Sequence, residues 1–142
     1  MITETNYIKR KDGKSFKLKQ NLTCNNYGIY VAQCVVCNQT YVGQSINKFS
    51  TRFNAHRKNW KDALNGILRQ NQFNKDENAL FNHYQKFHQD KINQDKFEFD
   101  QSYKIIFAEQ PPPHNLNLAE STWASDLEAE INVAKMFLPR FK

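Results

Sequence analysis

The sequence predicts a small α/β domain in which a three-stranded, mostly antiparallel sheet is flanked by helices. Three features predict this fold: a hairpin-like stretch at 27–43, a helical pattern directly after it, and an alternating, then apolar stretch at 96–110. The chain has 142 residues, a length that suits one domain with one modest core. Eleven Phe, six Tyr and two Trp offer large areas for burial, so we expect a globular chain.

The first two strands are expected at residues 27–33 and 39–43, joined by a turn at the Asn-Gln pair between them. Ser45 or Asn47 is then placed to cap a helix, because a short polar side chain at that position accepts a backbone hydrogen bond. Four residues recur at helical spacing and predict the buried stripe of this helix: Ile46, Phe49, Phe53 and Trp60.

The rest of the chain is expected to alternate between helix and strand. Residues 62–76 are predicted to be a loop or a frayed helix, 77–88 a helix and 96–110 the third strand. Prolines 111–113 end that strand, and a last helix runs from residue 117 or 118 to about 133. The inward positions are expected to be Leu80, Phe81, Tyr84 and Phe87 in the first of these helices, and Leu118, Trp123, Leu127 and Ile131 in the last.

The N-terminal residues 1–22 are polar and rich in lysine, so we expect a basic arm or linker outside the core, followed by one domain over 23–142. The net charge is +6 and the isoelectric point about 9.2. Such a surface is either simply solvated or the binding face for a polyanion such as DNA. The sequence contains no apolar run of membrane-spanning length and no apolar segment of a secretory signal, so we expect no membrane partner.

Three cysteines are an odd number for a disulfide framework, and two of them have the spacing of a metal knuckle. Cys34 and Cys37 are separated by two residues, as in zinc sites, although small buried side chains would give the same pattern. Cys24 is either unpaired or a substitute ligand. We expect a reducing, intracellular compartment, the nucleus or the cytoplasm.

Five positions carry groups that suit metal-assisted attack on a phosphodiester. The tripeptides Gly28-Ile29-Tyr30 and Tyr41-Val42-Gly43 bring two tyrosine hydroxyls onto one hairpin. Arg52 and His56 stand one helical turn apart, and Glu120 opens a later helical pattern. Such a reaction needs a deprotonated water and stabilisation of the phosphoryl charge, which these side chains can supply with a divalent ion.

This set resembles the GIY-YIG nuclease family over roughly residues 27 to 132. The first tripeptide matches the family letter for letter, and the second differs only by Val42. The Arg-x3-His step, the Glu-x-x-Trp step ending at Trp123, and Asn132 follow in the family's order. With His83 and His88, the two cysteines resemble the endonuclease domain of Penelope-like retroelements, in which a Cys-Cys-His-His zinc site is built into this fold.

The resemblance implies a Mg²⁺-dependent DNA endonuclease, in which Mn²⁺ can substitute, with a structural Zn²⁺ and nuclear localisation. It would nick or cleave target DNA, so that a reverse transcriptase domain of the parent polyprotein primes from the new end.

The resemblance also assigns roles to individual residues. Glu120 would hold the Mg²⁺ and Arg52 would clamp the phosphate. Tyr30 is then the general base, with His56 as an alternative or assisting base, and Tyr41 positions the water or the phosphate. The residues that support them are Gly28 and Gly43, which permit close approach, and Asn132, which makes hydrogen bonds to the residues around the site. The zinc ligands would be Cys34, Cys37, His83 and His88.

Structural explanations exist for the same residues. Glu120 is also an ordinary acid at a helix N-terminus, and the two tyrosines can pack as cross-strand partners. The alternatives are therefore a catalytically silent DNA-binding module, or a repair or homing-type nuclease of the same chemistry. The target sequence, the choice between nicking and double-strand cleavage, and the oligomeric state are not fixed by these patterns.

Overall fold

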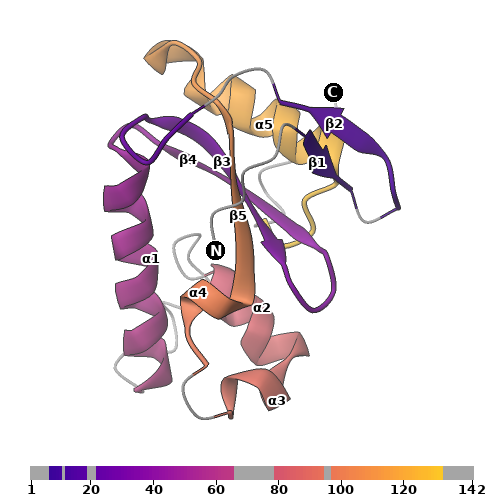
Figure 1. Cartoon of the computed structure of the whole chain (residues 1–142), viewed down its shortest axis with the longest axis vertical. Helices are drawn as coiled ribbons and strands as arrows, with labels where there is room; N and C mark the ends of the chain where they lie inside the picture. The colour runs from indigo at the N-terminus through magenta and orange to yellow at the C-terminus, as the bar shows by residue number, and fades with distance from the viewer. Residues whose placement is uncertain (1–6, 11, 19–21, 66–78, 95–96, 133–142) are drawn as a thin grey trace.

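The computed structural model describes residues 7–10, 12–18, 22–65, 79–94 and 97–132 (Figure 1). Its strands are β1 (Tyr7–Lys9), β2 (Ser15–Lys17), β3 (Gly28–Cys34), β4 (Thr40–Ser45) and β5 (Tyr103–Glu109). Its helices are α1 (Phe49–Leu64), α2 (Ala79–Phe87), α3 (Gln89–Ile92), α4 (Phe99–Ser102), the 3₁₀ turn η3 (Pro113–Asn115) and α5 (Leu116–Leu127). None of the described helices is long and apolar enough to cross a membrane.

The main sheet has three strands in the order β4-β3-β5, and both pairings are antiparallel. This confirms the predicted fold class. Tyr30, at the start of β3, lies opposite Gly43 on β4 and Phe107 on β5. Helix α1 and helix α5 lie on opposite sides of the sheet in Figure 1.

The two faces of the sheet form two separate apolar clusters, because side chains alternate along a strand. Tyr30, Ala32 and Cys34 of β3 pack with the aromatic residues of α1, α2 and α4. Ile29 and Val31 of the same strand pack with α5 and with the N-terminal hairpin. Strand β3 is therefore buried on both faces along its whole length, and polar groups on it must find partners inside the protein.

Two residues of the β3–β4 hairpin have a positive φ, which the shape of the hairpin requires. Gly28 has a φ of +136°, and a Cβ there would overlap the carbonyl oxygen of Glu109 on β5. At the other end Asn38 has a φ of 64°, and its backbone N–H donates to the carbonyl of Cys34 at 2.9 Å. Asparagine tolerates this left-handed conformation. The turn itself covers residues 35–37, so it begins earlier than the predicted Asn-Gln pair, and Asn38 closes it.

The predicted cap of the first helix is wrong. Lys48 precedes α1 and makes no side-chain capping bond. Ser45 instead bonds within the turn, donating from Oγ to the carbonyl of Asn47 at 2.8 Å and accepting from its N–H at 3.2 Å. Ile46 lies in this turn, 68% exposed, and so does not belong to the buried stripe. Phe49, Phe53 and Trp60 are buried as predicted.

The third strand is shorter than predicted because a one-turn helix precedes it. Glu98 and Gln101 form reciprocal capping bonds that start α4, so β5 begins only at Tyr103. Helix α1 continues to Leu64, and the rest of the predicted loop, 66–78, lies outside the described residues. Phe87 and Leu118 are 65% and 68% exposed, so their predicted inward positions are wrong.

Helix α5 ends six residues before the predicted boundary. Glu128 adopts a left-handed conformation, with a φ of 52°, which stops the helix after Leu127. The chain then runs to the edge of the sheet, where the N–H of Ile131 donates to the carbonyl of Thr40 at 3.1 Å. Hydrogen bonding to β4 therefore replaces the last predicted helical turn.

The N-terminal residues contribute more to the core than the sequence indicates. Strands β1 and β2 pair as an antiparallel hairpin. Ile8 is completely buried in the cluster on the α5 side, and Phe16 and Leu18 pack against that cluster. The expectation that 1–22 lies outside the core is wrong for these residues, whereas a domain boundary at residue 22 stays a prediction.

Candidate active site and candidate metal centre

Three of the predicted catalytic side chains form one hydrogen-bonded group. Tyr30 extends from β3 toward α1, and its hydroxyl lies 2.7 Å from Nε2 of His56. Arg52, one turn earlier on α1, donates from Nε to the same hydroxyl at 3.3 Å. Tyr30 and His56 are 0% and 3% exposed, whereas Arg52 is partly exposed. The arginine is thus the member of the group that reaches the surface.

Gly43 makes room for this group. It pairs with Tyr30 across the sheet, and a Cβ at Gly43 would overlap the tip of the Tyr30 ring, including its hydroxyl. The group that closely approaches Gly43 is therefore the Tyr30 side chain. Tyr41 is fully buried beside it, with ring centroids 6.3 Å apart.

His56 is held in its neutral form. Burial, and then the nearby positive charge of Arg52, lower the pKa of His56 from 6.5 to about 3. A neutral imidazole keeps one nitrogen lone pair, so it can accept a hydrogen bond from a neighbouring hydroxyl, whereas its low pKa disfavours taking the proton itself.

Glu120 lies on α5 and contacts the other side of β4. Gln44, which follows Gly43, donates from Nε2 to Oε1 of Glu120 and also to Oδ1 of Asn117, the latter at 2.7 Å. Neighbouring residues on a strand point to opposite faces. Gly43 therefore borders the tyrosine group, whereas Gln44 binds the carboxylate. Glu120 is only 4% exposed.

Asn132 closes the edge of β4. Its Nδ2 donates to the carbonyl of Val42 at 2.8 Å, and its Oδ1 accepts from the N–H of Val42 at 2.7 Å. One side chain thus imitates the backbone of a neighbouring strand. Asn132 anchors the segment after α5 to the strand that carries Gly43 and Gln44.

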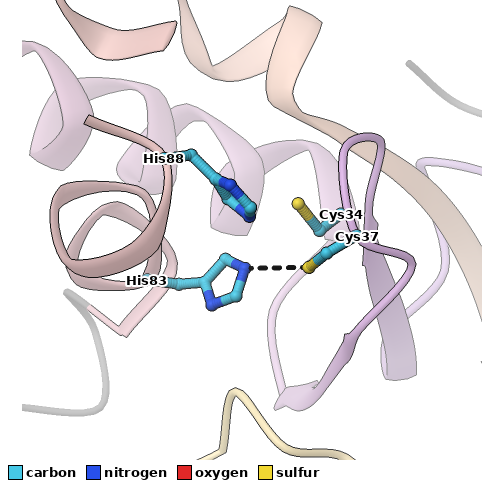
Figure 2. A group of neighbouring side chains, drawn as sticks. All are labelled: Cys34, Cys37, His83 and His88. Carbon is cyan, nitrogen blue, oxygen red and sulfur yellow. Dashed lines mark hydrogen bonds between the residues drawn. The ribbon is translucent and has the colours of Figure 1, made fainter. Parts of the chain in front are cut away.

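The four predicted metal ligands converge at the other end of β3. Cys34 ends the strand, Cys37 lies in the turn after it, His83 is on α2, and His88 directly precedes α3. Figure 2 shows the four side chains pointing into a common space. Their ligand atoms all lie within 4.8 Å of one another, and Cys37 Sγ is 3.3 Å from His83 Nε2.

The chemistry of this group fits a metal ion. Nε2 of His88 is buried and has no hydrogen-bond partner in the described part of the chain. Burial, with His88 nearby, lowers the pKa of His83 to about 4, which keeps it in the neutral form that binds metals. Burial also raises the pKa of the Cys37 thiol, an effect that a bound cation would reverse. The group can hold a metal ion.

Two further residues belong to these sites although the sequence analysis did not name them as site residues. Tyr84 contacts the metal-binding group, and Gln44 contacts Glu120. The Tyr84 hydroxyl accepts from Sγ of Cys34 at 3.3 Å and donates to the carbonyl of Ser102 at 2.6 Å. In the sequence Tyr84 directly follows His83, and Gln44 directly follows Gly43. These neighbours were the signals from which the two residues could have been predicted as site residues. Cys24 packs against the same apolar cluster and is not a member of the metal-binding group.

Comparisons of the chain with known protein families, with curated proteins and with solved structures found no match.

Proposed function

We propose that this protein is a metal-dependent DNA endonuclease of the GIY-YIG type, most like the endonuclease domain of Penelope-like retroelements. The observation that carries the proposal is the hydrogen-bonded group of Tyr30, His56 and Arg52, with Gly43 leaving space for it. The chemistry of the side chains and the family resemblance grouped these residues in one site, and they lie in contact although they come from separate elements.

In this proposal Tyr30, in its ionised form, accepts the proton of the attacking water. The Nε–H of Arg52 can only donate, so the Tyr30 oxygen accepts from it. The Tyr30 hydroxyl can donate a hydrogen bond to Nε2 of a neutral His56, in the tautomer that leaves this nitrogen unprotonated. The low pKa of His56 keeps the proton off the imidazole, so the positive charge of Arg52 is what favours the ionised tyrosine, whose proton leaves to solvent. The guanidinium of Arg52, which reaches the surface, would bind non-bridging phosphate oxygens.

Glu120 is the proposed ligand for Mg²⁺. In the described residues, only the cysteine and histidine group brings three or more metal-binding side chains together. A Mg²⁺ at Glu120 would therefore take one carboxylate from the protein and its other ligands from water and DNA phosphate, which matches its reluctance to lose water. When bound, this ion would supply charge stabilisation at the phosphoryl group. Gln44 orients the carboxylate that holds it.

Zn²⁺ is the proposed ion for the cysteine and histidine group. Two thiolates and two imidazoles form a closed tetrahedral set with no position for substrate, which is typical of a structural zinc. It would join the hairpin of β3 and β4 to α2 and α3. We further propose that the domain acts in the nucleus and serves an attached reverse transcriptase.

A plasmid-nicking assay tests the catalytic proposal. Purified protein should nick supercoiled plasmid with Mg²⁺ and not with EDTA. Glu120→Gln and Arg52→Ala should each slow nicking by about 10² or more, the effect of removing one strong transition-state interaction. Asp90→Asn, an exposed acid on α3, is the matched control and should nick normally. Wild-type nicking by Glu120→Gln would overturn the assignment.

A catalytically silent DNA-binding module is the second candidate, and burial favours it. Tyr30 and Tyr41 are both 0% exposed, whereas a general base must reach the water that it deprotonates. Under this alternative the protein binds duplex DNA but leaves supercoiled plasmid intact with either Mg²⁺ or Mn²⁺. Nicking that EDTA abolishes and that Glu120→Gln reduces would exclude it.

A further inference from the structure

The N-terminal hairpin has one buried face and one exposed basic face. In its register Ile8 pairs with Phe16, and this pair packs inward. The neighbouring pairs, Tyr7 with Lys17 and Lys9 with Ser15, must point the other way because side chains alternate along a strand. All four of these residues are exposed. The outer face therefore combines two lysines, one tyrosine and one serine.

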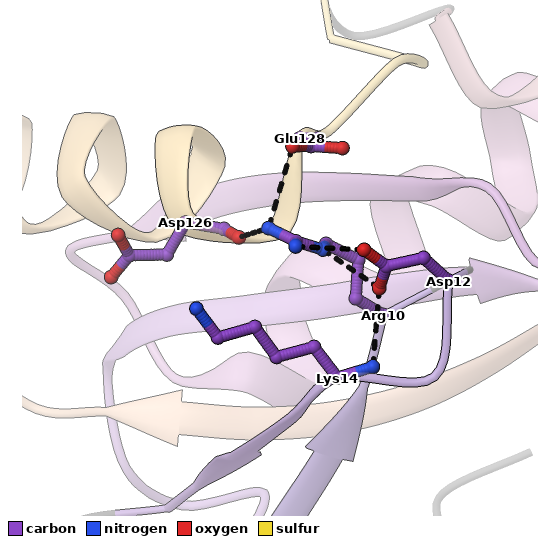
Figure 3. Close-up of polar contacts among 5 residues, drawn as sticks. All are labelled: Arg10, Asp12, Lys14, Asp126 and Glu128. Carbon is purple, nitrogen blue, oxygen red and sulfur yellow. Dashed lines mark hydrogen bonds and ion pairs between the residues drawn. The ribbon is translucent and has the colours of Figure 1, made fainter.

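Arg10 fixes this hairpin to the body of the protein (Figure 3). Its guanidinium donates to both carboxylate oxygens of Asp12, at 3.0 and 2.8 Å, and to the carbonyl of Asp126 at 2.9 Å. It also lies 3.4 Å from the carboxylate of Glu128. Arg10 thus binds the last turn of α5, whose carbonyls attract a positive charge. A second attachment comes from Gln33, which donates to the carbonyl of Lys9 at 2.9 Å.

The same contacts determine which positively charged side chains of the hairpin are available to bind an anion. Arg10 is used internally, and it also engages the acids Asp12 and Glu128. Lys14 lies over the ring of Phe16, 5.4 Å from its centroid. Among the described residues, neither Lys9 nor Lys17 forms an ion pair. The two lysines of the outer face can therefore bind an anion without breaking an existing contact.

The position of the hairpin relates this face to the proposed active site. Arg10 contacts the end of α5 at Asp126, and Glu120 lies six residues earlier on the same helix. Six helical residues span about 9 Å. Phosphates on one DNA strand are spaced about 3.4 Å apart along the duplex axis. The hairpin thus contacts α5 at a distance from Glu120 that corresponds to about three base pairs.

We propose that the outer face of the β1–β2 hairpin, through Lys9 and Lys17, binds the phosphate backbone of duplex DNA a few base pairs from the bond that is cut. The inference rests on the proposed function for its choice of partner. Because its inner face is packed on the core, the hairpin can contact DNA only through its outer face, where the charged groups are the ammonium groups of the two lysines, which bind phosphates. Its contribution is therefore independent of base sequence and sensitive to salt.

The test measures how the binding of the whole chain to a 30-base-pair duplex of arbitrary sequence depends on salt concentration. Ca²⁺ replaces Mg²⁺ so that the duplex is not cut during the measurement. The variant Lys9→Gln/Lys17→Gln is compared with Lys86→Gln/Lys104→Gln, which removes the same charge from exposed positions on α2 and β5. The hairpin variant should lower the slope of log Kd against log salt by about two, one for each phosphate that a lysine no longer neutralises. The control should leave the slope nearly unchanged. Circular dichroism and the melting temperature establish that both variants fold.

Each outcome decides the matter. A slope that falls equally in both variants would overturn the proposal, because only the overall charge of the protein would then matter. A slope that falls in neither variant would also overturn it, because neither pair of lysines would then contact phosphates. A loss of binding seen with single-stranded RNA and absent with duplex DNA would also overturn it. Plasmid nicking at low salt separates this inference from the proposed function. If the two variants differ in slope but the protein does not nick plasmid, the hairpin is the DNA contact of a catalytically silent module. If the protein nicks plasmid but the two variants have equal slopes, the proposal for the hairpin is rejected and the proposed function stands.

Discussion

The two ends of β3 hold polar groups on the same face of the sheet, and these groups are satisfied in different ways. At the Gly28 end, Tyr30 is bonded to His56 and Arg52 within the protein. At the Cys34 end, the ligand atoms of two cysteines and two histidines face one another, and Nε2 of His88 has no partner in the described residues. The first group is complete as it stands. The second group could be completed by a metal ion.

This difference identifies the group whose stability a bound metal ion would change. A buried nitrogen without a partner costs free energy, and a metal ion would remove that cost together with the repulsion among close donors. The tyrosine group gains nothing comparable in stability from a metal. We therefore expect metal removal to act mainly on stability at one end of the strand, and substitutions at the other end to act mainly on catalysis.

The largest effect should come from the metal centre. Purified protein should contain about one zinc per chain, and Cys37→Ser or His88→Ala should lose it and melt at a lower temperature. Structural zinc sites contribute on the order of 10 kcal/mol of binding free energy, which is coupled to folding. Elemental analysis and thermal melts measure this.

Cys24→Ser is the matched control for that experiment. Cys24 is the third free cysteine, and it packs near the same cluster without being one of the converging ligands. It should keep its zinc. Metal-free protein that is as stable in the Cys37→Ser variant as in the wild type would contradict the prediction.

The next effect should appear in catalysis at the other end of β3. Tyr30→Phe should reduce nicking by about 10² or more if this hydroxyl accepts the proton, which is the scale of losing a general base. His56→Gln should then be milder, because glutamine can still bond the hydroxyl. The reverse order would assign the base to His56. Both variants should retain zinc, which separates a catalytic loss from unfolding.

Gly43→Ala should show a smaller effect on stability, with a loss of nicking. The new methyl group overlaps the Tyr30 ring, so the ring must shift away from His56 and Arg52. Overpacking of this kind costs about 1–3 kcal/mol. Urea unfolding measures the stability loss, and unchanged zinc content would show that the shift stays at this end of the strand. Wild-type stability and nicking together would mean that the ring has room to move.

A last effect should be a pH dependence of stability from His56. The pKa of His56 falls from 6.5 to about 3 in the folded protein, so between these values the unfolded chain binds a proton that the folded chain does not. The stability present above pH 6.5 is therefore lost as the pH falls toward 3, by up to about 1.4 kcal/mol per pH unit. Urea unfolding at pH 7 and pH 5 should show a steeper loss for the wild type than for His56→Gln. Equal losses would remove His56 as the cause.

Local patterns predicted the parts of the fold that local physics controls. The alternation around the two tripeptides predicted the hairpin, and helical spacing placed Phe49, Phe53 and Trp60 inside. The predictions failed at several positions, and a distant element decided the last of them. Ser45 bonds within a turn, Leu118 stays exposed, and the end of α5 is drawn to β4 by Asn132.

By itself the sequence determined which residue types are present and how they are spaced: the Cys-x-x-Cys knuckle, the Arg-x3-His step and the aromatic stripe. Only the tertiary structure decided that Gly43 clears space for Tyr30, that Gln44 binds Glu120, and that Arg10 attaches the N-terminal hairpin to α5. The physical reason is sequence separation. Each of these contacts joins residues on different elements, and no periodicity along the chain records which side chain will lie opposite.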